Sequence, residues 1–349
     1  MSIRLLLPQD LINLVPLEEA LAVVREAFRD FGNDPLLNAP RHRVHTKQGL
    51  RITVHQGIAP SSGVGGILTH AEMLQTDKLR QNFLHHGQPV SVITNVSNGQ
   101  LMGIIVGAIG YSGFPEATTG LRTAATSVAG TDLLAKPGPL NVGLLGTGKQ
   151  AFYHVNLLSK IREFRSLNIY SPTQEHRDSF VSTIANKLGG SARAVTRPED
   201  AVVGMDAILL CTNSSVPVVD GNYFVPGQHI TSIVGSNVGL VESGLSQHKR
   251  RELDNTLIAR ADIVMVASRE QAIQDQQGDL FDPVSDGILS WEEVVELGEV
   301  LDGKREGRTS PEQLTVFKNN AGQGIADVAL ASLALRHAEE HNIGLVLET

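Results

Sequence analysis

The sequence predicts an α/β protein built on a doubly wound parallel sheet, and three observations lead to that fold. A short apolar run, residues 142–145, has the character of a buried parallel strand. It ends in a G-x-G-x-x-A turn at residues 146–151, and apolar residues at helical spacing follow to residue 161. Beyond that point strand-like and helix-like segments alternate, which is typical of a parallel sheet covered by helices.

The glycine turn also predicts a dinucleotide site, because it lies between a strand and a helix. Gly146 allows a tight turn, Gly148 lets the backbone approach a pyrophosphate, and Ala151 keeps the helix close to the strand. The first N–H groups of that helix then face the phosphates. We expect the turn to contact the cofactor through Gly146, Thr147, Gly148, Lys149 and Gln150.

Composition places the chain among ordinary globular proteins. Its 349 residues can form two domains, with 41% hydrophobic and 19% charged residues. A net charge of −8 argues against a nucleic-acid partner. No apolar run reaches the roughly 18 residues of a membrane span, and no signal-peptide pattern is present, so we expect a cytoplasmic protein. Cys211, the single cysteine, lies in an apolar run and is expected to be a small strand residue.

The first 120 residues mix helix and strand. A helix is expected from Pro16 through Phe28. Asn98-Gly99 is a strong hairpin signal, and sequential strands with tight turns predict an antiparallel sheet. The expected strands are residues 50–55, 65–70, 90–96 and 101–108.

The rest of the chain carries the parallel sheet. Helices are expected at residues 119–135, 175–188, 290–301 and 324–342, and strands at 167–170, 207–211, 229–234 and 262–267. Composition allows the last helix either to close the dinucleotide domain or to return and pack on the first domain.

Several motifs resemble those of the ornithine cyclodeaminase / mu-crystallin family. They are G-L-R-T-A-A-T-S at residues 120–127, E-L-G-E-V-L-D-G-K at 296–304, Gly307-Arg308, and L-T-V-F-K at 314–318. The resemblance runs from about Pro40 to the last helix and is strongest in the dinucleotide-binding half. Family members include ornithine cyclodeaminases, amino-acid dehydrogenases, and ketimine or pyrroline-carboxylate reductases.

This resemblance implies a domain organisation. A Rossmann domain, residues 119–323, is expected to be inserted in a discontinuous α+β substrate and dimerisation domain, residues 1–118 plus 324–349. The last helix would then belong to the first domain, and the protein would be a homodimer.

The resemblance also implies site residues. Arg122 and Thr123 match the family's R-T pair beside the cofactor phosphates and the substrate carboxylate, which a guanidinium binds through two parallel N–H bonds. Arg41 matches a second carboxylate-binding arginine, although Arg43 is close in register. At the carboxyl ends of the expected strands, the nicotinamide should be contacted by Thr212, Asn213 and Gly235, for which ordinary turn chemistry is the alternative.

Two departures from the family pattern concern deamination. Cyclodeaminases carry an aspartate where this chain has Asn237, which cannot titrate and can only orient or hydrogen-bond; a register slip would put Ser236 there instead. The family's lysine is also missing from residues 65–70. Both losses affect ammonia-releasing ring closure, whereas neither prevents hydride transfer to a C=N bond.

A proton source is needed only if the imine arrives unprotonated. His45, His55 and His70 are then the candidates, and His70 ranks first because it lies beside the missing lysine. No metal site is expected.

Cofactor choice can be inferred from the end of the second strand. NAD-binding proteins usually have a carboxylate there, and this chain has none. Ser171, Thr173 and Arg177 suit a 2′-phosphate, which favours NADP(H) over NAD(H), although residues 175–177 could simply open a solvated helix.

The sequence thus predicts a nicotinamide-dependent oxidoreductase that reduces a small imino acid or ketimine, or oxidises an amino acid in reverse. Its expected partners are a small-molecule substrate and a second copy of the chain, with neither nucleic acid nor membrane. The alternatives are an amino-acid cyclodeaminase and a non-catalytic, crystallin-like protein that binds a dinucleotide or small ligand.

Overall fold

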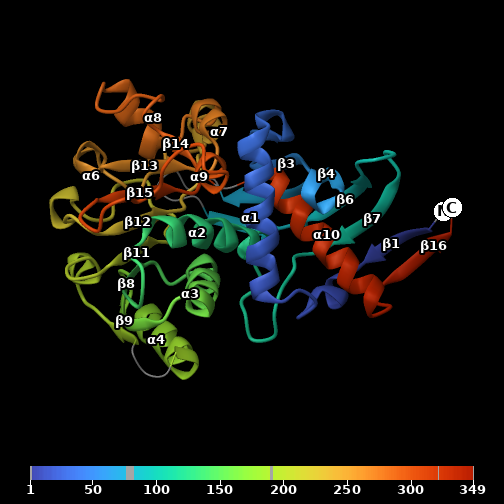
Figure 1. Cartoon of the computed structure of the whole chain (residues 1–349), viewed down its shortest axis with the longest axis horizontal. Helices are drawn as coiled ribbons and strands as arrows, with labels where there is room; N and C mark the ends of the chain where they lie inside the picture. The colour runs from blue at the N-terminus through green and yellow to red at the C-terminus, as the bar shows by residue number, and fades with distance from the viewer. Residues whose placement is uncertain (1, 76–81, 189–191, 321, 349) are drawn as a thin grey trace. The chain divides into compact units, whose positions relative to one another are not determined.

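The structure, a computed structural model, describes residues 2–75, 82–188, 192–320 and 322–348 (Figure 1). The chain divides into two compact units. Unit 1 contains residues 1–126, 239–247 and 322–349, and unit 2 contains residues 127–238 and 248–321. The residues of unit 2 therefore lie between the first and the last segments of unit 1 in the sequence. The units change at 126/127 and 321/322, eight and two residues from the expected boundaries, and the sequence has no signal for the return of residues 239–247 to unit 1.

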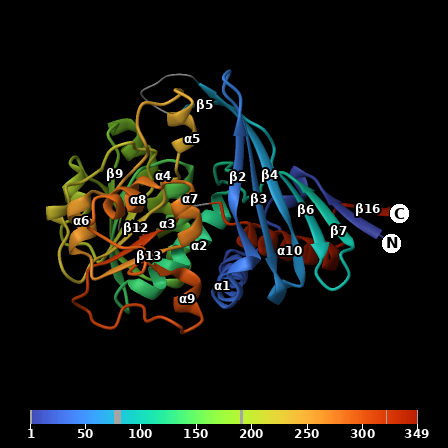
Figure 2. The same cartoon turned by 90° about the horizontal axis from the view of Figure 1, so that it is seen from above.

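Unit 1 is a mostly antiparallel sheet with two long helices against one face (Figure 2). Its strand order is β16-β1-β7-β6-β4-β3-β2, with β5 paired to β4, and β1 and β7 run parallel. The helices are α1 (Leu17–Asn33) and α10 (Gly324–Glu340). The strands are β1 (Ser2–Leu6), β2 (Asn38–His45), β3 (Leu50–Ala59), β4 (Val64–Gln75), β5 (Asn82–His86), β6 (Val90–Asn95), β7 (Leu101–Val106) and β16 (Leu345–Glu348).

Two glycines bring the start of α10 directly onto β3. A Cβ at Gly57 would lie 2.2 Å from the backbone nitrogen of Ile325, and a Cβ at Gly324 would lie 2.2 Å from the carbonyl of Gln56. Only glycine permits such an approach of two backbones. The inward-facing side chains of β3, which include His55, therefore lie beneath the first turn of α10.

Unit 2 is a parallel sheet in the order β10-β9-β8-β11-β12-β15-β13-β14. From β8 (Leu140–Leu145) the chain passes to β9 (Phe164–Tyr170) on one side, and β11 (Ala207–Leu210) lies on the other. This reversal confirms the doubly wound fold. The other strands are β10 (Ala192–Ala194), β12 (His229–Ser232), β13 (Ile263–Val266), β14 (Val295–Glu296) and β15 (Thr315–Lys318).

Among the described residues between 120 and 301, three helices are long and five are short. The long ones are α2 (Gly120–Leu134), α3 (Lys149–Ile161) and α4 (Gln174–Leu188). The short ones are α5 (Val238–Glu242), α6 (Asn255–Arg260), α7 (Arg269–Gln274), α8 (Gly278–Ser285) and α9 (Leu297–Leu301). Within the described residues, no helix has the length and apolar character needed to cross a membrane.

The helix expected at residues 290–301 is wrong in its first half. Val295 and Glu296 form the edge strand β14, which pairs with β13, and α9 begins at Leu297. Burial of Val294 and Val295 against the sheet outweighs the local helical pattern. Cys211 is buried, and burial raises the pKa of its thiol well above the usual value, as suits an inert strand-end residue.

Candidate functional site

The glycine turn of unit 2 leaves room for a ligand in front of α3. Gly146 has φ +107°, and a Cβ there would meet the Cys211 carbonyl oxygen at 2.3 Å. Gly148 is the N-cap of α3, and no atom lies within 4 Å of the place its Cβ would take. Ala151 is buried. Tight turn, open approach and close helix packing are what a dinucleotide pyrophosphate requires, so the turn fits this cofactor.

The other residues of the turn remain accessible. Lys149 is exposed, and Thr147 and Gln150 are half-buried. The carbonyl of Gln150 accepts a hydrogen bond from His154 Nδ1 at 2.7 Å, and the other ring nitrogen of His154 lies 2.8 Å from the hydroxyl of Ser127. Burial lowers the pKa of His154 to about 4, so this histidine is a neutral support under the turn at neutral pH.

The loop after β9 is closed by a buried arginine. Arg177 Nη1 donates to the carbonyl of Ser171 at 2.5 Å, and its side chain is buried against this loop. Ser171 is buried and Thr173 is exposed. In doubly wound folds this loop lies beside the adenine ribose. Ser171, Thr173 and Arg177 therefore all lie in this loop or against it.

A buried carboxylate joins the loops that follow β11 and β12. Glu252 Oε1 accepts from the backbone N–H and the hydroxyl of Thr212, each at 2.7 Å. Its Oε2 accepts from the backbone N–H groups of Ile233 and Val234 at 2.9 and 3.0 Å. Burial raises the pKa of Glu252 despite the nearby Lys318. Asn213 is exposed and Gly235 half-buried beside these anchored segments.

Lys318, at the end of β15, supplies the positive charge of this network. Its Nζ lies 2.6 Å from Asp279 Oδ2 and donates to the hydroxyl of Ser232 at 2.8 Å. Asp279 Oδ1 accepts from the backbone N–H groups of Glu252 and Leu253 at 2.7 and 2.9 Å. The network holds the carboxyl ends of two strands in place. Sequence reasoning missed it, although the apolar strand ending in lysine was a usable signal.

Asn237 is buried, and its amide group is engaged with the backbone. Its Nδ2 donates to the carbonyl of His248 at 3.0 Å, and its Oδ1 accepts from the N–H of Arg250 at 2.8 Å. The neighbouring Ser236 hydroxyl donates to the carbonyl of Asp275. Neither position holds a group that can act as a base near neutral pH, whichever register applies.

Unit 1 contains a buried cluster of charged side chains centred on Asp327. Arg122 Nε donates to Asp327 Oδ1 at 2.9 Å, and His55 Nδ1 lies 2.8 Å from Asp327 Oδ2. These three side chains are at most 4% exposed. Arg122 Nη1 is also buried and makes no hydrogen bond with the described residues. A guanidinium with one edge paired and an unused N–H is suited to an additional carboxylate.

Arg41 and His70 belong to the same cluster. A Cβ at Gly322 would lie 2.9 Å from both Arg41 Nη1 and His55 Nε2, so these two atoms flank one point. The rings of His55 and His70 meet edge to face, with centroids 5.8 Å apart. Thr123 is buried on the same turn of α2 as Arg122. In contrast, His45 is exposed at the end of β2.

Burial and charge set the protonation states here. Burial lowers the pKa of His55 even though Asp327 is adjacent, and burial lowers the pKa of His70 to about 4. Burial alone would raise the pKa of Asp327, but Arg122 and His55 hold it below its usual range. At neutral pH the cluster therefore contains an ionised Asp327, a charged Arg122 and two neutral imidazoles.

A small cavity of about 40 Å³ lies beside this cluster. Arg122 and Asp327 line one part of it, and apolar side chains line most of the rest: Leu68, Ile105, Ile109, Leu121, Leu330 and Ala331. Asp327 was not among the residues expected from the sequence. Its signal was a lone carboxylate on the apolar face of the last helix.

The chain is similar to several characterised proteins. The sequence pattern described as "Ornithine cyclodeaminase/mu-crystallin family" matches residues 5–342. A Δ(1)-pyrroline-2-carboxylate reductase of Bacillus cereus is 29% identical over 231 residues, covering 66% of this chain and 67% of the relative. The ketimine reductase mu-crystallin of Mus musculus is 31% identical over 238 residues, covering 68% and 65%. The structure of Thermococcus litoralis Δ(1)-pyrroline-2-carboxylate reductase, in complex with NADH and L-proline, has a TM-score of 0.83 at 23% identity and covers 98% and 99%.

Proposed function

Because the chain belongs to the ornithine cyclodeaminase / mu-crystallin family, we propose that it uses a nicotinamide cofactor to reduce the C=N bond of a small imino acid or ketimine. Reverse oxidation of the corresponding amino acid is the same chemistry. The observation that carries this proposal is the buried Arg122–Asp327–His55 cluster with Arg41 beside it. The names of the relatives, pyrroline-carboxylate and ketimine reductases, agree with it.

The substrate carboxylate is assigned to the two arginines. Asp327 holds Arg122 through Nε and leaves Nη1 for a ligand. A fork of N–H donors fixed in this way orients a planar carboxylate and so positions the adjoining carbon. The apolar lining of the adjacent cavity suits a compact hydrocarbon side chain or ring.

Reduction also needs a proton on nitrogen. A bound reduced nicotinamide supplies a hydride to the imine carbon. Because burial keeps His55 and His70 neutral at neutral pH, neither is an imidazolium that could act as the proton donor there. We infer that the enzyme binds the substrate as the protonated iminium, whose nitrogen becomes the amine when hydride arrives. The role of His55 is to donate one hydrogen bond from Nδ1 to the ionised Asp327 and so to fix its carboxylate.

The cyclodeaminase alternative needs a catalytic base that residue 237 of this chain does not provide. Water attack with loss of ammonia requires a base, and Asn237 is an amide bonded to the backbone of His248 and Arg250. The carboxylate that is present, Asp327, has a lowered pKa and two partners, which makes it a weak base. The crystallin-like alternative predicts cofactor binding without turnover, and the assay below separates it from the reductase.

NADP(H) is proposed as the preferred cofactor. The buried guanidinium of Arg177 closes the loop after β9, and the described strand end, Tyr170 and Ser171, offers no carboxylate to repel a 2′-phosphate. Measured dissociation constants test this: NADPH should bind more tightly than NADH, and Arg177→Ala should remove the difference. Tighter binding of NADH by the unmodified protein would reverse the assignment.

A homodimer formed through unit 1 is also proposed. On β3 most of the residues that alternate with the buried ones are apolar, and two of them are exposed, Ile52 at 39% and Ile58 at 43%. Val44 on β2 and Met102 on β7 are exposed as well. An apolar sheet face of this kind suits a second copy of the same sheet. Light scattering should give twice the chain mass, and Ile52→Glu with Ile58→Glu should give monomers; a monomeric wild type would contradict the proposal.

The enzymatic test uses Δ(1)-pyrroline-2-carboxylate and a panel of other imino acids, with oxidation of NADPH as the readout. We expect turnover with at least one imino acid. Arg122→Lys keeps the charge but loses the fork, so KM should rise about 10- to 100-fold, as expected for losing a charged hydrogen bond. The exposed Arg165→Lys is the matched control and should change nothing. Cofactor binding with no turnover across the panel would favour the non-catalytic alternative.

A further inference from the structure

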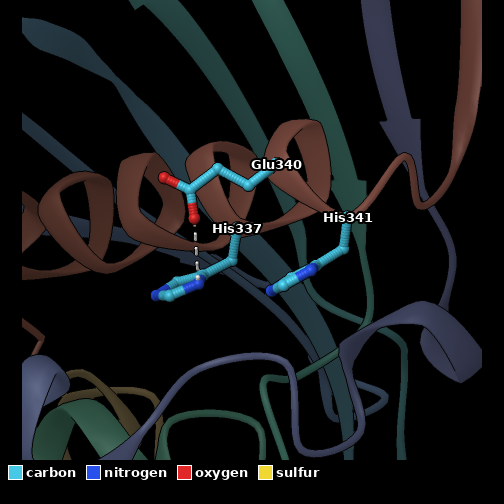
Figure 3. A group of neighbouring side chains, drawn as sticks. All are labelled: His337, Glu340 and His341. Carbon is cyan, nitrogen blue, oxygen red and sulfur yellow. Dashed lines mark ion pairs between the residues drawn. The ribbon is translucent and has the colours of Figure 1, made fainter.

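The last turn of α10 carries two histidines and a carboxylate on one side of the helix (Figure 3). His337 and His341 are one helical turn apart, and their rings stack with centroids 6.2 Å apart and an interplanar angle of 11°. Glu340 reaches back to His337, with Oε2 3.6 Å from Nδ1. One donor atom from each of the three residues can be chosen so that all lie within 4.8 Å of one another.

We propose that His337, Glu340 and His341 form a binding site for a divalent transition metal, with Zn²⁺ as the representative ion. Two imidazoles at i and i+4 on one helical face are the spacing of helical zinc sites. Two nitrogen donors and one oxygen donor suit Zn²⁺, Ni²⁺ or Cu²⁺, whereas Mg²⁺ and Ca²⁺ prefer oxygen alone. With metal–ligand bonds of about 2.0–2.1 Å, neighbouring ligands of a tetrahedron lie about 3.3 Å apart, close to the observed Glu340–His337 distance.

A carboxylate from a second helix orients the first ligand. Glu19 of α1 has Oε2 2.9 Å from His337 Nε2. When that nitrogen donates to Glu19, Nδ1 is left with a lone pair, and Nδ1 is the nitrogen that faces Glu340. Metal-binding histidines usually donate the other ring N–H to a carboxylate, a backbone carbonyl or water, which fixes the tautomer and the ring plane. Glu19 is therefore the positioning residue of the site.

The place of the site at the C-terminus of α10 also favours a bound cation electrostatically. His341 is the C-cap of α10, so the ion would lie beside the last carbonyl groups, where the helix dipole favours positive charge. The site is part of neither the charged cluster around Asp327 nor the glycine turn. Metal binding there is therefore independent of the proposed reductase reaction.

Zn²⁺ titration of the untagged chain against a chromogenic chelator tests the proposal. We expect one tight Zn²⁺ per chain. Removal of an orienting partner typically weakens metal binding 10- to 100-fold, so Glu19→Ala should weaken it about tenfold and His341→Ala, which removes a ligand, at least about a hundredfold. His176→Ala removes an exposed histidine on α4 and is the control; it should leave the affinity unchanged.

Electron paramagnetic resonance with Cu²⁺ gives a readout that misfolding cannot imitate. The unmodified chain should show coupling to two imidazole nitrogens and His341→Ala to one, while circular dichroism shows that the variant is folded. The proposal is overturned if no Zn²⁺ binds, if His341→Ala binds Zn²⁺ as tightly as the unmodified chain, or if His176→Ala weakens binding as much as His341→Ala does.

Discussion

Asp327→Asn is the substitution that most directly tests the organisation of unit 1. The amide has the shape of the carboxylate, so packing between α10 and β3 is retained while the negative charge is lost. Arg122 then keeps a buried positive charge without its ionic partner. Removing one member of a buried ion pair costs about 3–5 kcal/mol, because the remaining charge has been taken out of water. An asparagine oxygen can still accept from Arg122 Nε, which places the expected loss near the lower end, about 3 kcal/mol.

Thermal and urea unfolding at neutral pH measure that loss. A change of about 3 kcal/mol corresponds to roughly 6–12 °C in the melting temperature of a unit of this size. Asp178→Asn, an exposed residue on α4, is the control and should change stability by less than about 0.5 kcal/mol.

A double variant separates the cost of the stranded charge from the cost of substitution itself. Adding Arg122→Met to Asp327→Asn removes the stranded charge, so the pair should be more stable than Asp327→Asn alone even though it carries one more substitution. If Asp327→Asn were as stable as the unmodified chain, or if adding Arg122→Met lowered stability further, the ion pair would not anchor the cluster. The double variant should also bind the carboxylate substrate poorly, because the Arg122 guanidinium is lost.

Three further predictions concern unit 2. His154 has a pKa of about 4 in the folded chain against a value near 6.5 in the unfolded chain. Its linked contribution to the free energy of unfolding, about 3 kcal/mol, is present above pH 6.5 and is lost as the pH falls towards 4. His154→Asn should therefore flatten that part of the stability–pH curve. Lys318→Met strands the Asp279 carboxylate and should cost about 3–5 kcal/mol, measured by unfolding, whereas Lys318→Met with Asp279→Asn should cost less. The enzyme should release no ammonia from ornithine in the presence of oxidised cofactor, since Asn237 is not a base. Asn237→Ala should lower the reductase rate modestly. Ammonia release at about 1–10³ per second would restore the cyclodeaminase alternative.

The sequence predicted unit 2 well because its signals are local. A buried strand, a glycine turn and a helix follow one another within residues 142–161, and each step needs only its neighbours in the chain. The family was predicted from such short motifs and is confirmed. The error at β14 has the opposite cause, since a two-residue edge strand exists only through its pairing with β13.

The cluster in unit 1 was only half predictable. Arg41 and Arg122 were expected from the family resemblance, and His70 from its place beside the missing lysine. Asp327, the residue that joins Arg122 to His55, lies 272 positions from His55 and 205 from Arg122 in the chain. No local pattern reports a contact across that separation. It follows from the close approach of Gly57 and Gly324, which seats α10 on β3.

The histidines show where local reasoning and structure diverge, and they give the last prediction. Proximity to the missing lysine ranked His70 first, but His55 is the histidine bonded to Asp327, and burial lowers the pKa of both. If neither donates the proton, kcat/KM for imine reduction should fall at alkaline pH where the substrate iminium itself loses its proton. His70→Asn should then leave the position of that alkaline limb unchanged, whatever it does to KM. Profiles recorded for two imino acids of different basicity decide the matter. A limb that follows the substrate supports delivery of the proton with the substrate, whereas a limb that stays fixed for both substrates and shifts in His70→Asn would make His70 the acid after all.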